Sequence, residues 1–299
     1  DALGSSNPGV TRTYTIRQPD QTEATVSVIK SEYELDPISD RYGVKVIDNG
    51  GTPVGYINLR TFIVEDAGTQ LRAAIDGFRQ QGISEVILDF RYNGGGLVSV
   101  AETLGDLLGA DKVGQQFSRT IFRDSLSSNN ATRLFETRPQ AIAATKIALI
   151  GTGSTASASE LVGNAFIPYL GNNTALVGSN TYGKPVGQIA RDKAECDDRL
   201  RVVAFRTVNA AGGGDYYNGL ASVYPQTCAA TDDIFDPLGS VDEASTGAAL
   251  GFLRGAACSA IGQAGAAGQS QRGQIKQVEY QAIRPTEPSA AQYRIPGLF

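Results

Sequence analysis

Hydroxyl side chains are concentrated where a strand-like segment gives way to a helix-like one. Residues 152–160 read TGSTASASE, and they lie between the apolar segments KIALIG and LVGNAFIPYL. A Ser or Thr at the start of a helix most often caps it by accepting hydrogen bonds from free backbone amides. The same position also suits a nucleophile, because the positive end of the helix stabilises a developing negative charge. The run alone favours capping, and one serine could do either.

A serine nucleophile needs a base, and this chain contains no histidine. A Ser-His-Asp arrangement is therefore excluded, which leaves Lys, Asp, Glu or Tyr. Lys184 stands out because its segment, TYGKPVGQ, has no other charge between Asn180 and Ala190. A lysine in apolar surroundings loses its proton more easily, since desolvation disfavours the cation. The other lysines are expected to be solvated: Lys30, Lys45, Lys112, Lys146, Lys193 and Lys276.

A second unusual loop, RYNGGGL, follows the apolar segment EVILDF. Consecutive glycines let a backbone approach a ligand closely, and the free amides of a following helix would point at an anion. That anion could be a phosphate or the oxyanion of an acyl-transfer intermediate. The loop matches neither of the glycine patterns typical of nucleotide phosphates. An oxyanion site and a tight structural turn therefore remain as the two interpretations.

Both loops fall within a repeated pattern of strands and helices. Apolar residues recur at helical spacing over 66–80, over 97–108 and from Ser157 to about Leu170. The strand-like segments are EVILDF, KIALIG and TALVGS, the last followed by NTYGKPVGQIA. Strands that alternate with helices predict an α/β core with a mainly parallel sheet. Ligands and catalytic groups collect at the carboxyl ends of such strands, where both loops lie.

The two ends of the chain have a different pattern. Residues 10–36 alternate apolar and polar positions around QPDQ, which predicts a β-hairpin. A further strand is expected at LRVVAFRTV and a late helix over 242–257. Gly, Ala, Gln, Ser and Pro dominate from residue 262 onward and predict an extended tail. We therefore expect three parts, over residues 1–40, 41–261 and 262–299.

Composition excludes several classes of function. A formal net charge of -5 leaves no basic surface for nucleic acid or an anionic membrane. No apolar run approaches the roughly 20 residues of a membrane-spanning helix. The cysteines form no C-x-x-C pair and have no histidine to complete a zinc site. They allow one disulfide, with Cys196 and Cys228 as the expected pair, or three unpaired thiols.

Three blocks together resemble the signature of the C-terminal (tail-specific) processing proteases, the S41 serine peptidases with a Ser/Lys dyad. The blocks are EVILDFRYNGGGL, TASASELVGNAF and TYGKPVGQ, in this order. The resemblance implies a serine endopeptidase with a core of the ClpP/crotonase-like type. It implies that Ser157 is the nucleophile, Lys184 the base and Gln188 a residue that assists the lysine. The backbone amides of Gly95 and Ala158 would form the oxyanion hole.

The resemblance also implies the surroundings of the reaction. The partners would be protein or peptide substrates, cut near their C-termini, with no cofactor and no metal. The location would be the periplasm or cell envelope of a bacterium. Residues 1–40 would be the remnant of a PDZ-like domain. Two alternatives stay open: a peptide- or lipid-binding protein that no longer cuts, and a crotonase-like acyl-CoA enzyme. The second would need a basic phosphate pocket, which this acidic chain does not offer.

Overall fold

The computed structural model describes residues 5, 7–18, 20–33, 35–196 and 198–262. The chain divides into two compact units, Asp1–Asp36 and Pro37–Phe299. In the first unit, β1 (Thr11–Arg17) and β2 (Glu23–Ile29) pair antiparallel around the QPDQ turn. The relation of this hairpin to a PDZ domain stays a prediction. The tail expected over 262–299 lies outside the described residues, except for Gly262.

A six-stranded sheet forms the centre of the second unit, in the order β12-β9-β8-β5-β4-β3. Every neighbouring pair is parallel except β3 and β4, so the mainly parallel sheet is confirmed. The parallel strands bring their carboxyl ends to one edge, which we call the carboxyl edge. The bounds are β3 (Val44–Asp48), β4 (Pro53–Asn58), β5 (Glu85–Asp89), β8 (Lys146–Gly151), β9 (Thr174–Gly178) and β12 (Gln226–Ala229).

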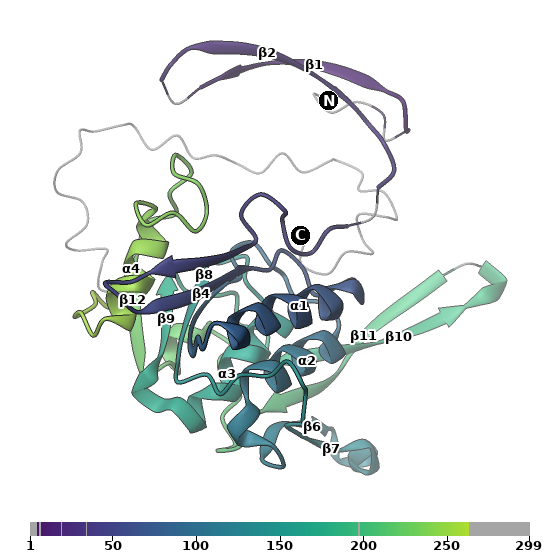
Figure 1. Cartoon of the computed structure of the whole chain (residues 1–299). Helices are drawn as coiled ribbons and strands as arrows, with labels where there is room; N and C mark the ends of the chain where they lie inside the picture. Colours follow the sequence, from purple (N-terminus) through teal and green to yellow (C-terminus); the bar gives the residue numbers. More distant parts are fainter. Residues whose placement is uncertain (1–4, 6, 19, 34, 197, 263–299) are drawn as a thin grey trace. The chain divides into compact units, whose positions relative to one another are not determined.

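Helices cover both faces of this sheet, which explains why its strands are continuous apolar runs. On β5, Val86 and Leu88 pack with residues of three helices, whereas Ile87 packs with those of a fourth. The first face carries α1 (Asp66–Gln80), α2 (Val98–Leu108) and α3 (Ala158–Leu170), and the second carries α4 (Ala244–Leu253). Figure 1 shows this layered arrangement around the central strands. The helices expected over 66–80, 97–108 and 157–170 are present.

The third repeat departs from the strand-helix pattern, because β9 is followed by another strand. This strand belongs to a second, antiparallel sheet in the order β10-β11-β6-β7. Its strands are β10 (Val186–Lys193), β11 (Asp198–Val208), β6 (Gln116–Phe122) and β7 (Ala131–Leu134). Short 3-10 helices are η1 (Ala110–Lys112), η2 (Asp124–Asn129), η3 (Gly171–Asn173), η4 (Ala194–Cys196) and η5 (Leu220–Ser222).

Two expectations about single residues were wrong. The disulfide joins Cys228 to Cys258, and Cys196 is a free, exposed thiol. The chain after α4 returns to β12, where the Ala229 amide bonds the Ser259 carbonyl, and this return brings the two cysteines together. Lys112 is buried rather than solvated, and it pairs with Asp111 at 2.7 Å. Within the described residues, no helix is long and apolar enough to cross a membrane.

Candidate active site

Ser157 stands between β8 and α3 in a backbone conformation that few residues with a side chain adopt. Its φ is 57° and its ψ is -113°, directly before the first residue of α3. Such a conformation costs on the order of 1–3 kcal/mol and persists only where the surrounding structure enforces it. A serine on a sharp strand-to-helix turn presents its hydroxyl at the carboxyl edge of a sheet. This geometry favours a chemical role over simple helix capping.

The glycine loop touches the serine loop at Gly95. A Cβ atom on Gly95 would lie 2.8 Å from the Ala158 nitrogen and 2.9 Å from the Ser157 Cβ. No side chain fits there, and the φ of Gly95, 99°, is also one that favours glycine. The two loops that the sequence singled out are therefore in direct contact.

Asn93 links these two loops through hydrogen bonds. Its backbone carbonyl accepts hydrogen bonds from the Ala156 amide at 3.1 Å and the Ser159 hydroxyl at 2.9 Å. Its buried side chain donates to the Leu59 carbonyl and accepts from the Gly95 amide at 3.0 Å. Ser159 thus has a structural partner, and the Gly95 amide is already engaged. Among the described residues, the Ala158 amide has no such acceptor.

Glu160, in the first turn of α3, connects the serine to the lysine. The carboxylate is fully buried and accepts four hydrogen bonds. The donors on Oε2 are the amides of Ser157 at 2.9 Å and Lys184 at 2.8 Å. Oε1 accepts from the Thr181 hydroxyl at 2.6 Å and the Gly183 amide at 2.8 Å. One carboxylate therefore fixes the backbones of both candidate catalytic residues.

Lys184 lies in the loop that leads from β9 to β10, and its side chain is partly buried. Desolvation lowers its pKa from the usual lysine value; the charge of Arg201 acts in the same direction, and that of Glu160 opposes it. The sequence found the apolar neighbours along the chain but not these two charges. The side chains of Lys184 and Ser157 form no hydrogen bond with each other in the described structure.

Gln188 is placed four residues further on, in strand β10. The pairing of β10 with β11 shifts between Gly187 and Gln188, which marks a β-bulge. The Gln188 side chain is exposed and makes no hydrogen bond to Ser157 or Lys184 in the part of the chain that is described. Bulges often re-aim a side chain next to a functional site. The structure thus brings Ser157, Ala158, Gly95 and the Lys184 backbone together, and leaves the Gln188 side chain exposed on β10.

The family of the chain follows from a comparison with known protein families. The model of peptidase family S41 matches residues 53–218, which is more than half of the chain. The chain belongs to peptidase family S41. The matched residues include Gly95, Ser157, Lys184 and Gln188, so the candidate site lies inside the S41 region.

Curated relatives match over part of their length. A carboxyl-terminal-processing protease of Picosynechococcus sp. is 28% identical over 178 residues, which are 59% of this chain and 39% of that protein. A protein of Staphylococcus aureus strain N315, inferred to be a CtpA-like serine protease, is 27% identical over 59% of this chain and 35% of its own length. The S41 chain described here thus spans less than half the length of these relatives.

Solved structures share the fold of this S41 chain. A candidate S41 protease from Bacteroides fragilis has a TM-score of 0.68 at 24% identity, covering 83% of this chain and 68% of that one. The photosystem II D1 C-terminal processing protease has a TM-score of 0.51 at 19% identity, covering 74% and 56%. At this level of identity, the similarity establishes the α/β fold.

A second buried network, which the sequence did not reveal, lies beside the glycine loop of this S41 core. Arg91 is 2% exposed and donates to Asp89 and to Glu243, the residue that caps α4. Tyr56 donates to the same Asp89 at 2.7 Å. Burial works to raise the pKa of Glu243, but hydrogen bonds from Arg91 and Thr246 outweigh it and leave the pKa below its usual value. This network fixes α4 to the end of β5.

Sequence analysis did not identify Glu160, Arg91 or Glu243 as site residues, and the sequence signals for them differ in strength. Glu160 follows Ser157 by three positions, which is the spacing of a capping box, and this signal could have marked it. Arg91 lies in the block RYNGGGL, but its partner Glu243 is 152 positions away. Across the described residues, no group of His, Cys, Asp or Glu is arranged to hold a metal ion.

Proposed function

We propose that this S41 chain is a serine endopeptidase that uses Ser157 as nucleophile and Lys184 as general base. The observation that carries the proposal is the geometry of Ser157, which has a strained backbone, contacts Gly95 and shares Glu160 with Lys184. A helix cap does not require a left-handed serine or a second loop packed against it. A nucleophile on a sharp strand-to-helix turn accounts for the strained serine, and an oxyanion loop accounts for the packed glycine.

The reaction would begin with attack of Ser157 Oγ on a peptide carbonyl carbon while neutral Lys184 Nζ takes the hydroxyl proton. The carbonyl oxygen becomes an oxyanion, stabilised by the Ala158 amide and by an amide of the glycine loop. Collapse of this intermediate expels the amine, which receives the proton from Lys184. Water then hydrolyses the acyl-enzyme by the same route. Gln188 would assist Lys184 from β10.

Two features of the site have to adjust for this reaction. The Gly95 amide would exchange Asn93 Oδ1 for the substrate oxyanion, whereas the Ala158 amide needs no such exchange. Lys184 Nζ would move to Ser157 Oγ, since catalytic hydrogen bonds often tighten only when substrate is bound. The lowered pKa of Lys184 supports its role as a base, because a larger fraction is then neutral near neutral pH.

Substrate class and location belong to the same proposal. A similar protein is named a carboxyl-terminal-processing protease. By analogy, this chain would cleave protein substrates near their C-termini. Its place would be the bacterial periplasm or cell envelope, and residues 1–40 would be the end of a PDZ-like domain.

The test is digestion of a disordered protein by the wild type and by Ser157→Ala, with the cleavage sites mapped. We expect Ser157→Ala to abolish cleavage while lowering the free energy of unfolding by about 1 kcal/mol or less, the cost of losing one capping hydroxyl. Ser154→Ala is the matched control, because Ser154 is exposed in the same loop and should leave cleavage intact. Cleavage by Ser157→Ala at the wild-type rate would refute the mechanism, whereas absence of cleavage by the wild type itself would favour the binding-protein alternative.

A further inference from the structure

Residues 230–243, which we call the strap, join β12 to α4 and cross the carboxyl edge of the sheet. At one end, the Ala230 amide donates to the Gly178 carbonyl, where β9 ends. Further along, the Leu238 carbonyl accepts a hydrogen bond of 2.8 Å from Lys45 Nζ on β3. Because β9 and β3 lie near opposite sides of the sheet, the strap passes over the ends of the strands between them.

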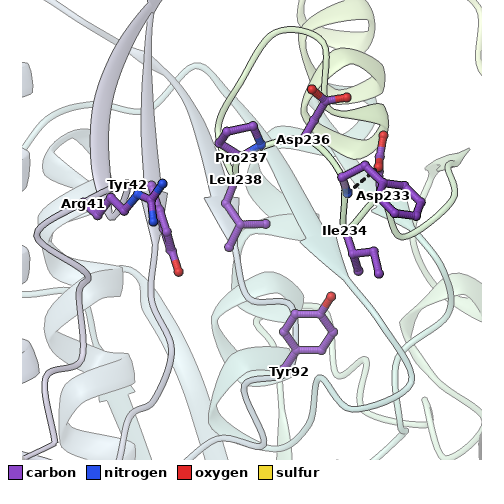
Figure 2. A pocket seen from close by; sticks show the side chains of 9 residues that line it. Arg41, Tyr42, Tyr92, Asp233, Ile234, Asp236, Pro237 and Leu238 are labelled. Atoms are coloured by element: carbon purple, nitrogen blue, oxygen red, sulfur yellow. Dashed lines mark hydrogen bonds between the residues drawn. The ribbon is translucent and has the colours of Figure 1, made fainter. Parts of the chain in front are cut away.

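A pocket of about 310 Å³ lies beneath the strap. In Figure 2, Tyr92, Leu238 and Ile234 surround its open centre, Arg41 and Tyr42 form one wall, and the carboxylate of Asp236 lies on the side away from Tyr92. The lining residues are Arg41, Tyr42, Tyr92, Asp233, Ile234, Phe235, Asp236, Pro237 and Leu238. All of them belong to the second unit.

The apolar lining of the pocket is unusually accessible. Ile234 is 77% exposed, Phe235 is 70% exposed and Tyr92 is 54% exposed. Single exposed apolar residues are ordinary, but several around one concavity mark a binding site. A bulky apolar side chain of a ligand would remove this surface from water.

The pocket is connected to the candidate active site through Tyr92. Tyr92 directly precedes Asn93, whose side chain holds the Gly95 amide. The Tyr92 hydroxyl donates to Asp232 of the strap at 2.6 Å, and its φ of 64° turns the ring out of the loop. Tyr92, which lines the pocket, thus lies three residues before Gly95, which packs against Ser157.

The charges around the pocket favour a cation over an anion. Asp233 and Asp236 make no ion pair with any described residue, and Arg41 is the one basic residue that lines the pocket with them. Asp232 is a third carboxylate on the strap, but it accepts from Tyr92 and lies 3.7 Å from the Arg91 guanidinium, so its charge is already paired. With more carboxylates than cations on the rim, a positively charged ligand group gains and a carboxylate is repelled.

We propose that this pocket is a substrate subsite that takes a bulky apolar side chain whose neighbour in the polypeptide is Lys or Arg. The apolar side chain would contact Tyr92, Ile234 and Leu238, and the cation would lie against Asp233 and Asp236. The proposal rests on the proposed peptidase function, and it names the sequence that the enzyme prefers beside the scissile bond.

The test separates binding from cleavage by using the Ser157→Ala protein. A short fluorescent peptide with one Phe-Lys pair in a Gly/Ser background and an amidated C-terminus is titrated by fluorescence anisotropy. We expect it to bind about tenfold more tightly than its Phe-Glu and Ser-Lys counterparts, a ratio that corresponds to about 1.4 kcal/mol. Ile234→Ala should remove the preference for Phe over Ser. The double variant Asp233→Asn/Asp236→Asn should remove the preference for Lys over Glu. Leu200→Ala, at a position 63% exposed on β11, is the control and should change neither.

The same variants in the active protein give the second readout, the cleavage sites in a disordered protein. Enrichment of apolar-basic pairs near the sites in the wild type, and its loss in the pocket variants, supports the subsite. If none of the pocket variants changes peptide affinity or the cleavage sites, the subsite proposal is overturned and the peptidase proposal remains intact. Tight binding of the Phe-Lys peptide without any cleavage of protein would support the pocket as a peptide-binding site and would refute the proposed peptidase function. Binding that requires a free carboxyl terminus and is lost in Arg41→Gln also overturns the proposal.

Discussion

Two buried glutamates at the starts of two helices have opposite surroundings. Glu160 in α3 accepts four hydrogen bonds, and all four donors are neutral amides or a hydroxyl. Glu243 before α4 accepts amides too, but it also faces the guanidinium of Arg91 at 2.8 and 3.0 Å. Neither side chain is exposed to solvent. One carboxylate is held by dipoles and the other by a counter-charge.

On the proposed mechanism, this difference separates a residue that positions the catalytic groups from a residue that only stabilises the fold. Desolvation lowers the pKa of Lys184, and the negative charge of Glu160, which is solvated by amides but not neutralised, partly opposes this shift. The charge of Glu243 is paired with Arg91, which also pairs with Asp89, and this network joins α4 to the end of β5. We therefore expect changes around Glu160 to alter activity and its pH dependence, and changes around Glu243 to alter stability.

The largest expected effect is the loss of activity when Lys184 is replaced. In the proposed mechanism Lys184 acts as a base only in its neutral form, whose population depends on the charge of Glu160. A guanidinium stays protonated at working pH, so Lys184→Arg should be as inactive as Lys184→Ala. The expected loss in kcat is on the order of 10³-fold, within the range for removal of a general base. Initial rates on a disordered protein measure it. Lys193→Arg, on β10, is the control and should keep full activity, whereas robust cleavage by Lys184→Arg would remove Lys184 from the mechanism.

The second expected effect is a loss of stability in Glu243→Gln, which tests the structural role assigned to Glu243. Glu243→Gln leaves the buried Arg91 without its second carboxylate, and loss of one partner of a buried pair typically costs about 3–5 kcal/mol. Denaturant unfolding should show this loss, while the activity of the remaining folded protein and its pH midpoint stay close to wild type. Asp76→Asn, which breaks an exposed pair with Arg79, should cost less than about 1 kcal/mol. An intact fold with a displaced pH midpoint in Glu243→Gln would contradict the structural assignment.

The same comparison explains what the sequence could reveal. Apolar runs such as EVILDF and KIALIG predicted the parallel sheet, because burial on both faces leaves a continuous pattern. Ser157 and Lys184 were predicted from their local surroundings and from the family resemblance, and their roles stay a prediction. The Glu160 cradle joins positions 24 apart, and the Arg91 pair joins positions 152 apart. Such contacts exist only once the sheet has brought the loops together, as does the disulfide between Cys228 and Cys258.

The third effect is a loss of rate in Glu160→Gln. A glutamine amide offers one acceptor oxygen, so donors on the other side lose their partner inside a buried site. An unsatisfied buried donor costs about 1–3 kcal/mol, which corresponds to roughly a 5- to 150-fold loss in rate if the cost falls on the active geometry. The pH midpoint of kcat/KM should also fall, because removal of the Glu160 charge lowers the pKa of Lys184 further. A rate loss with an unchanged midpoint would reduce Glu160 to a structural role.

The smallest effect concerns Arg201, which lies opposite Ala190 in the β10–β11 pairing and lowers the pKa of Lys184. Arg201→Gln removes a repelling positive charge, so the pKa of Lys184 should rise and the pH midpoint of kcat/KM should move upward. Since Arg201 is exposed and water screens its charge, the shift should stay below about one pH unit.

The direction of this shift is opposite to that expected for Glu160→Gln, and only a charge effect on one titrating group gives both signs. Arg199→Gln is the matched control, because Arg199 lies on the same strand but pairs with Asp192 and should leave the midpoint in place. Equal shifts in Arg199→Gln and Arg201→Gln would indicate a general effect of net charge. Midpoints that move in the same direction in Glu160→Gln and Arg201→Gln would mean that the titrating group is not Lys184.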